Sequence, residues 1–216
     1  MTIACDSLQT SGLRLAILLL AAGEGSRLGG YPKALLKKDG DSLLKRFCLS
    51  AQAFDPVQML VVTGFYSEAI EEEVKSLQQE GLVQFECIRN ESPERGQGSS
   101  VRLGIESLKS NYDVLLVALC DQPHIGSPEI EALLKQFLGR SLGQEIILPM
   151  VNGWRGNPVI FSKNVIDDIL KTSGMIPRAY MDQNPRLVKT FETDNQAYLL
   201  DVDTKEDIQK LRLDAI

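Results

Sequence analysis

The stretch LLLAAGEGSRLGGYPKALL, residues 18–36, combines four glycines with two cationic side chains directly after an apolar run. Glycines permit positive φ and close backbone approach, so successive N–H groups can point at one anion. Arg27 and Lys33 add positive charge that a protein core could not satisfy. Because open α/β sheets bind ligands at the carboxyl ends of their strands, the pattern predicts a polyphosphate-binding loop after the first strand.

Two common phosphate-binding motifs do not match this loop. A dinucleotide fingerprint requires G-x-G-x-x-G and an acidic residue at the end of the second strand. Here the spacing is G-x-G-x-x-x-G, and the second strand ends in VVTGFY, with Gly64 and no carboxylate. A P-loop requires G-x-x-x-x-G-K-[ST], which the sequence lacks. An NAD(P)-dependent oxidoreductase stays open as an alternative, although Gly64 stands where its fingerprint needs an acidic residue.

A carboxylate follows another apolar run at the same predicted sheet edge. Asp121 comes just after residues 114–119, which read as a buried strand. Mg²⁺ at phosphate-transferring sites is commonly held by one or two carboxylates, phosphate oxygens and water. An aspartate before Gln122 and Pro123 is also a common turn residue. Because the glycine loop is predicted at the same sheet edge, the metal-binding interpretation of Asp121 is favoured.

The segment GQGSSVRLG places small residues at the start of a predicted helix. The backbone N–H groups at the start of a helix have no partner within it and can bind a ligand. Nucleoside contacts are therefore favoured for Gly98, Ser99 and Ser100. Arg102 reads as a cation on the helix surface. His124, the only histidine, is not favoured as a general base.

Composition limits the classes of protein that this chain can represent. Its 216 residues and 44% hydrophobic content suit one domain, and a net charge of −6 argues against binding to nucleic acid. The four cysteines are far apart and predict reduced, buried thiols. The apolar stretch 13–22 is too short to span a membrane, and residues 1–12 carry only one charge, Asp6. We expect a cytoplasmic protein with no membrane partner and a flexible tail over residues 1–12.

Apolar and amphipathic segments alternate along the chain, which predicts an α/β fold. The expected strands are 15–20, 57–62, 83–88, 114–119 and 145–149, and the expected helices are 42–54, 67–79, 98–109 and 128–138. This order is typical of a three-layer α-β-α sandwich with a mainly parallel, Rossmann-like sheet. Residues 13–216 are expected to form a single domain. Within it, 150–200 is interpreted as an acceptor-binding insertion, with a further strand at 187–191 and a last helix from Thr204.

The motif Leu20-Ala-Ala-Gly-Glu-Gly-Ser-Arg-Leu-Gly with Pro32-Lys33 resembles the nucleotidyltransferase signature L-A-A-G-x-G-x-R-[LM]-G-x-x-P-K, with one extra residue before Pro32. Further blocks, GQGSSVRLG, LCDQP, WRGNPVIF and LDVDTKED, resemble the molybdenum cofactor cytidylyltransferases of the MobA/MocA-like NTP transferase family. Together these blocks run from residue 15 to 210.

The resemblance implies a role for each matching position. Arg27, Lys33 and Asp121 would be catalytic. The nucleotide would be bound by Leu20, Ala21, Ala22, Gly23, Gly25, Ser26, Arg27, Lys33, Gly64, Gly98, Ser99 and Ser100. The acceptor would be bound by Gln122, Pro123, Trp154, Gly156, Asn157 and Pro158. Where guanylyl-transferring relatives carry a glycine pair, Ala21 and Ala22 fit a pocket for cytosine.

A second metal ligand is expected in LDVDTKED. If residues 201–203 end a strand, Asp201 and Asp203 share a face, and Asp203 is the preferred partner of Asp121. The opposing interpretation makes Asp203 or Thr204 a helix N-cap. The chain departs from the family at 174–178, where GMIPR replaces G-D-x-G-A-R. The aspartate of that motif is absent, and a proline, Pro177, stands in the segment.

The resemblance implies Mg²⁺-dependent transfer of CMP from CTP to the molybdopterin-type molybdenum cofactor, with release of pyrophosphate. It also implies a molybdoenzyme of the xanthine dehydrogenase type as the recipient. Two alternatives stay open besides the oxidoreductase. One is a nucleotidyltransferase with a sugar-phosphate or other phosphorylated acceptor, and the other is a carrier that delivers the cofactor without turnover.

Overall fold

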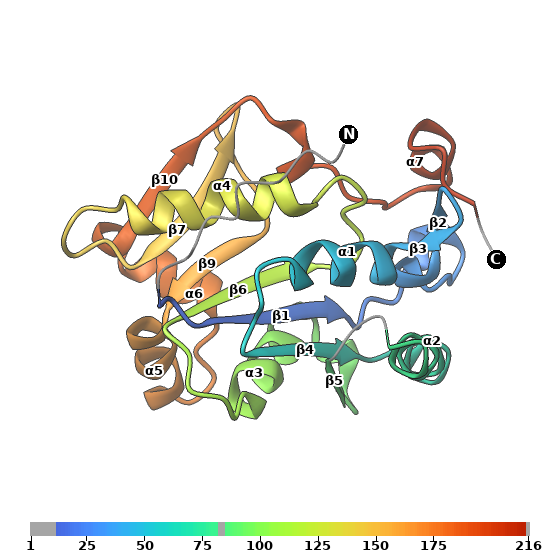
Figure 1. Ribbon diagram of the computed structural model, residues 1–216, viewed down its shortest axis with the longest axis horizontal. Coiled ribbons are helices and arrows are strands. Elements are labelled where there is room, and N and C mark those ends of the chain that lie inside the picture. Colours follow the sequence, from blue (N-terminus) through green and yellow to red (C-terminus); the bar gives the residue numbers. More distant parts are fainter. Residues whose placement is uncertain (1–11, 82–84, 215–216) are drawn as a thin grey trace.

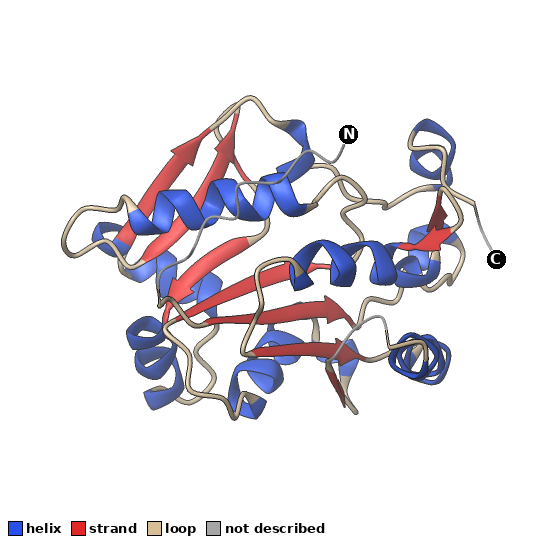
Figure 2. Ribbon diagram, in the orientation of Figure 1, coloured by secondary structure: helices blue, strands red, loops and turns tan. Residues whose placement is uncertain are grey.

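The computed structural model describes residues 12–81 and 85–214, so the predicted tail, except Gly12, lies outside the described residues. An eight-stranded sheet lies between two layers of helices (Figures 1 and 2). The predicted three-layer, mainly parallel fold is thereby confirmed.

The sheet has the strand order β10-β7-β9-β6-β1-β4-β5, with β8 paired to β7. Strands β5, β4, β1 and β6 are parallel, and β9 is antiparallel to both β6 and β7. The bounds are β1 Leu15–Ala21, β4 Gln58–Thr63, β5 Glu86–Arg89, β6 Val114–Leu119, β7 Ile146–Val151, β8 Trp154–Arg155, β9 Val159–Ser162 and β10 Val188–Glu192. A separate hairpin pairs β2 Lys37–Lys38 with β3 Asp41–Ser42.

Strand β1 lies at the centre of the parallel part and is buried along its whole length. Alternate side chains enter two cores, so Ile17 and Leu19 pack on one face, and Leu18 and Leu20 pack on the other. A strand covered on both faces needs a continuous apolar sequence, which explains the run LAILLLA. The rigid strand fixes the point at which the glycine loop begins.

The helices divide between the two faces of the sheet. Helices α1 Leu43–Gln52, α2 Ser67–Gln79 and α4 Ser127–Leu138 bury their apolar sides in the core of Ile17. Helices α3 Gln97–Ser107, α5 Lys163–Lys171 and α6 Pro177–Gln183 cover the other face. The short α7 Lys205–Lys210 packs beside β2 and β3 (Figure 1).

The four predicted helices agree with α1 to α4 within about two residues at each end. Strand β5 begins at Glu86, and the first part of the predicted strand 83–88 lies outside the described residues. The interpretation of 150–200 as an insertion needs correction, because β9 inserts between β6 and β7 and β10 extends the sheet. All four residues of β9 are buried, so this part of the segment belongs to the core of the domain.

Two of the cysteines agree with the predicted buried thiols, and one does not. Cys48 and Cys120 are buried without a disulfide, whereas Cys87 is exposed because β5 is an edge strand. Cys5 lies outside the described residues. In the part of the chain that is described, no helix combines the length and the apolar character needed to cross a membrane.

Candidate functional site

The glycine loop leaves β1 and folds into a short 3-10 helix, Ser26–Leu28. Gly25 and Gly29 flank that helix with φ of 62° and 86°, a conformation that favours glycine. A Cβ on Gly25 would also overlap the carbonyl oxygen of Tyr31. The amides of Leu28 and Gly30 donate to the carbonyl oxygen of Gly25, so they stabilise the loop itself. Binding of an anion by this loop stays a prediction.

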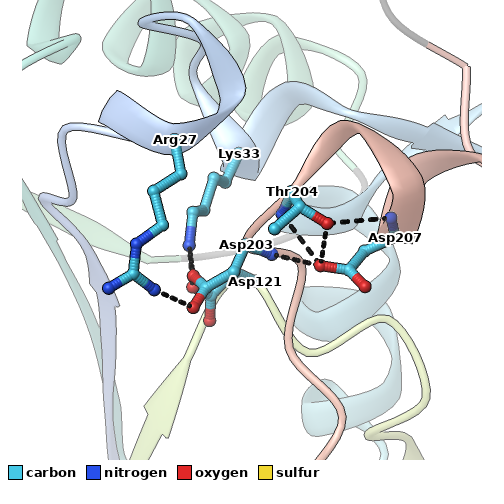
Figure 3. A network of polar contacts seen from close by, with 6 residues as sticks. All are labelled: Arg27, Lys33, Asp121, Asp203, Thr204 and Asp207. Carbon is cyan, nitrogen blue, oxygen red and sulfur yellow. Dashed lines mark hydrogen bonds and ion pairs between the residues drawn. The ribbon is translucent and has the colours of Figure 1, made fainter.

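Four charged side chains from distant parts of the sequence meet beside this loop (Figure 3). Lys33 Nζ lies 3.0 Å from Asp121 Oδ2 and 2.6 Å from Asp203 Oδ1. Arg27 donates to Asp203 Oδ2 over 3.1 Å. Asp121 follows β6, and its carbonyl oxygen accepts a hydrogen bond from the amide of Val202, which fixes the segment that carries Asp203. We call these four residues the charged cluster.

Burial differs among members of the charged cluster. The side chain of Lys33 is 16% exposed and that of Asp121 is 22% exposed, whereas Arg27 is 75% exposed. Burial alone would lower the pKa of Lys33, but Asp121 and Asp203 outweigh it, and the pKa of Lys33 is raised. The ammonium is therefore fully charged at neutral pH. The ion pair of Arg27 is open to solvent and correspondingly weaker.

Asp201 and Asp203 are not equivalent. Residues 199–203 form no strand, so the expected strand is wrong, and of these two aspartates only Asp203 forms ion pairs with Lys33 and Arg27. Partial burial, followed by the nearby charges of Asp121 and Asp203, raises the pKa of Asp201. The geometry favours Asp203 over Asp201 as the partner of Asp121.

The helix cap is made by different residues. Thr204 is the N-cap of α7, its hydroxyl accepts from the amide of Asp207 over 3.2 Å, and Asp207 Oδ2 accepts from the amide of Thr204 over 2.8 Å. This is the reciprocal capping box. Only the backbone amide of Asp203 contributes, donating to Asp207 over 3.2 Å. The side chain of Asp203 is thus available to the charged cluster (Figure 3).

We expect Thr204→Ala to lower the free energy of unfolding by about 1 kcal/mol, because the amide of Asp207 in the first turn of α7 loses the hydroxyl that accepts its hydrogen bond. Turnover should stay within a few-fold of the parent, since the side chain of Thr204 bonds Asp207 and no member of the charged cluster. Denaturant unfolding and pyrophosphate release would be measured on the same preparation. A large loss of turnover at unchanged stability would contradict this division of roles.

The residues present fit a divalent cation. Asp121 and Asp203 approach one ammonium, which shows that both carboxylates can reach a single cation. Asp121 Oδ1 is buried and has no hydrogen-bond partner among the described residues. Two hard oxygen donors, completed by phosphate and water, suit Mg²⁺ or a similar ion. The described ranges contain no group of three or more side chains that could enclose a metal, so a substrate would have to complete the coordination.

A cavity of about 490 Å³, the first cavity, opens beside Asp121 between the glycine loop and the start of α3. Four predicted nucleotide-binding residues line it: Leu20, Ala22, Gly23 and Ser100. Ala21 and Lys33 line a small adjoining hollow with Gly23 and Asp121. Sequence reasoning missed Phe65, Pro93 and Gln97 on the wall, since single residues in loops and helix starts carry no periodic signal.

Other predicted nucleotide contacts are placed differently. A Cβ on Gly64 would lie 2.9 Å from both Ala22 and Pro93, so Gly64 lets the wall of the first cavity close up. The hydroxyl of Ser99 donates to Gly96 and accepts from Asn90, and Ser99 lines a separate groove on α3 instead of the first cavity, so its nucleotide contact stays a prediction. Gly25 and Ser26 shape the turn of the loop.

A second cavity of about 410 Å³ shares Leu20, Gln97 and Leu119 with the first. Trp154, Gly156 and Asn157 line it, as expected of an acceptor site, and so does Gly98, which was expected at the nucleotide. Arg155 and Arg178 also line it. Arg155 pairs with Asp182 at 2.7 Å, whereas Arg178 forms no ion pair within the described part of the chain.

Three predicted acceptor residues do not line the second cavity. Gln122 is buried and donates to the carbonyl oxygen of Tyr198 over 3.0 Å. Pro123 lines another hollow together with His124. Pro158 lies between the lining residues Asn157 and Val159. Gln122 and Pro123 therefore do not line the second cavity, although Gln122 bonds the same carbonyl oxygen of Tyr198 as the amide of the lining residue Asn157, and their acceptor contacts stay predictions.

Arg102 is more than a surface cation. Its guanidinium donates from α3 to the carbonyl oxygens of Ile169, Leu170, Thr172 and Met175 over 2.9–3.2 Å. It thereby caps the end of α5 and holds the turn before α6. That turn leads to Ile176, which lines the second cavity and lies against Gly98. The segment GMIPR therefore forms part of the predicted acceptor wall.

Comparisons with known proteins agree with this architecture. A family model described as the MobA-like NTP transferase domain matches residues 17–186. Nicotine blue oxidoreductase of Paenarthrobacter nicotinovorans is 27% identical over 200 residues, which cover 90% of this chain and 94% of that protein. The bifunctional protein GlmU of Prochlorococcus marinus (strain MIT 9211) is 27% identical over 150 residues, or 69% of this chain. The chain spans only 32% of the length of that GlmU.

Solved structures share the fold at low sequence identity. A nucleotidyl transferase from Methanothermobacter thermautotroptrophicus superposes with a TM-score of 0.71 and 19% identity, covering 93% of this chain and 97% of that one. Rv0371c of Mycobacterium tuberculosis H37Rv in complex with manganese gives 0.65 and 19%, covering 92% and 97%. The inositol-1-phosphate CTP transferase from T. maritima gives 0.61 and 20%, covering 90% and 91%.

Proposed function

The chain belongs to the MobA-like NTP transferase family, and from this premise we propose that it transfers CMP from CTP to a molybdopterin-type molybdenum cofactor. The observation that carries the proposal is the pair of cavities at one sheet edge. They share Leu20, Gln97 and Leu119, so a nucleotide in the first and an acceptor in the second would meet beside the charged cluster. Two adjoining cavities suit the transfer of a group between two bound molecules.

In the proposed reaction, an oxygen of the acceptor phosphate forms a bond to the α-phosphorus of CTP. The bond from that phosphorus to the bridging oxygen breaks, and pyrophosphate leaves with the electron pair. The acceptor oxygen is already anionic, so the step needs no base, and His124 lies in a different hollow. Catalysis then rests on positioning and on neutralising charge at the phosphate oxygens.

The members of the charged cluster divide this work. Lys33 and Arg27 would bind the triphosphate and stabilise charge on the departing pyrophosphate. Asp121 and Asp203 would hold Mg²⁺, which when bound neutralises phosphate oxygens and aligns them. A protein with the same fold is a manganese complex, which supports the proposal of a divalent cation here. Asp121 also lines the first cavity, which brings its carboxylate to the nucleotide side.

A phosphorylated alcohol or sugar is the second candidate acceptor. The fold is shared with an inositol-1-phosphate CTP transferase, and the segment 174–178 departs from the cofactor-specific motif. Arg178, exposed at the second cavity, could bind the phosphate of any of these acceptors. The second cavity therefore supports a phosphorylated acceptor of either kind.

The test is a panel of nucleotides with Mg²⁺ and either the molybdenum cofactor or phosphorylated sugars and alcohols, with pyrophosphate release as the readout. Release with the cofactor supports the proposal, and release only with a sugar or alcohol phosphate selects the alternative. Binding of the cofactor without release indicates a carrier. Because one relative is named an oxidoreductase, hydride transfer to NAD(P)⁺ is measured in parallel, and its occurrence without pyrophosphate release would overturn the proposal.

We expect kcat/KM for CTP to exceed that for GTP by at least about tenfold, because a pocket built to hydrogen-bond one base leaves polar groups unpaired with another. Ala22 and Ser100 line the first cavity, and the lack of a side chain at Gly64 lets Gly64 lie against Ala22 and Pro93. Initial rates with the two nucleotides at equal Mg²⁺ give the ratio. Equal values would remove cytosine from the proposal but leave nucleotidyl transfer in place.

A further inference from the structure

The ammonium of Lys33 occupies the space between the two carboxylates that are proposed to hold the metal (Figure 3). Asp121 Oδ2 and Asp203 Oδ1 both accept from it, and Asp203 Oδ2 accepts from Arg27. Three of the four carboxylate oxygens thus face a cationic nitrogen. The fourth, Asp121 Oδ1, is buried and lacks a partner among the described residues.

The charges of the cluster cancel in this arrangement. Two carboxylates face one ammonium and one guanidinium, so within the charged cluster a divalent cation would find no excess negative charge, and Asp201 is the nearby acid outside the cluster. It would also meet the ammonium of Lys33 at the position where both carboxylates converge. Lys33 is 16% exposed, so water screens this repulsion poorly. Arg27 is 75% exposed and contacts only Asp203, so its effect is smaller.

We propose that Lys33 blocks the metal position until a nucleoside triphosphate arrives. The inference rests on the proposed function and adds an order of events to it. The phosphate oxygens draw the ammonium and the guanidinium toward themselves, which leaves Asp121 and Asp203 with two uncompensated charges. Asp121 and Asp203 would then be free to hold a divalent cation, and the phosphates would supply further oxygen ligands. Metal and nucleotide consequently raise each other's affinity, as linkage requires.

The test measures binding of Mn²⁺ alone to protein without nucleotide, using the EPR signal of the unbound ion. Lys33→Met keeps the length of the side chain and removes its charge, and we expect it to bind Mn²⁺ at least about tenfold more tightly than the parent. Lys33→Gln can still donate a hydrogen bond to a carboxylate and should give an intermediate gain. Arg27→Met should give a smaller one.

Matched controls separate the local effect from a change in net charge. Lys45 Nζ lies 2.8 Å from Asp41 Oδ1, and neither residue belongs to the charged cluster. Lys45→Met therefore removes the same charge as Lys33→Met and should leave Mn²⁺ affinity unchanged. Adding Asp121→Asn to Lys33→Met should abolish the gain. Circular dichroism verifies folding, and Lys33→Gln serves if the methionine variant does not fold.

The outcomes distinguish this inference from the function on which it rests. If the parent and both Lys33 variants bind Mn²⁺ with equal affinity, Lys33 does not block the site, although Asp121 and Asp203 can still be the ligands. If the protein removes no more Mn²⁺ from solution in the presence of CTP than CTP alone does, the proposed metal ligands fail, and this inference fails with them. Tight binding by the parent without nucleotide also overturns the order of events.

Discussion

Lys33→Ala is expected to lower kcat by on the order of 100-fold or more, because the variant loses a positioned charge at the departing pyrophosphate. The same substitution leaves Asp121 and Asp203 facing each other without a counterion. We therefore expect the free energy of unfolding to fall by about 1–2 kcal/mol, a small value because Asp203 is partly open to solvent. Pyrophosphate release at saturating nucleotide and metal gives kcat, and denaturant unfolding gives the stability.

Lys45→Ala is the control for this variant, since it also removes a lysine from an ion pair with an aspartate. It should leave kcat unchanged. Full turnover by Lys33→Ala would remove Lys33 from the catalytic machinery. Together with the Mn²⁺ experiment, the proposal predicts two opposite effects in one protein. Loss of the Lys33 charge should strengthen metal binding and should lower kcat on the order of 100-fold or more.

Asp121→Asn should also lower kcat by about 100-fold or more, and it should raise the concentration of Mg²⁺ needed for half-maximal rate. The asparagine keeps the shape of the side chain while removing the charge that a hard cation requires. Rates are measured over a range of Mg²⁺ at saturating CTP. A lower kcat with an unchanged dependence on Mg²⁺ would assign Asp121 to orienting Lys33 instead.

Two further substitutions calibrate that result. Asp203→Asn should show the same shift in Mg²⁺ dependence with a smaller loss of kcat, since Asp203 is 39% exposed against 22% for Asp121. Asp41→Asn removes a carboxylate that pairs with Lys45 outside the charged cluster, and the rate should not change.

The central strands could be predicted from sequence because burial on both faces demands a continuous apolar run, as in β1 and β6. Strand β9 was missed because its four residues follow a stretch rich in glycine, asparagine and proline. Its place between β6 and β7 depends on pairing with residues distant in sequence. Local sequence patterns carry no information about such strand pairing, which is why the sequence alone favours an insertion over residues 150–200.

The candidate site was predictable to a similar degree. Lys33, Asp121 and Asp203 were identified, and the structure brings their side chains together. The direction in which Gln122 and Pro123 point could not be foreseen, because a loop has no fixed period to assign side chains to a face. Phe65 went unnoticed for the same reason, although it lines the first cavity.

The hydrogen bonds of Arg102 set a rule for how the acceptor wall can vary among relatives. The four acceptors in residues 169–175 are backbone carbonyls, which every amino acid supplies. Substitutions in this turn therefore preserve the anchor, whereas an inserted or deleted residue would displace the carbonyls from the guanidinium. The side chains among the residues that supply these carbonyls can therefore change while Arg102 keeps the backbone beside Ile176 in place, and with it this wall of the second cavity.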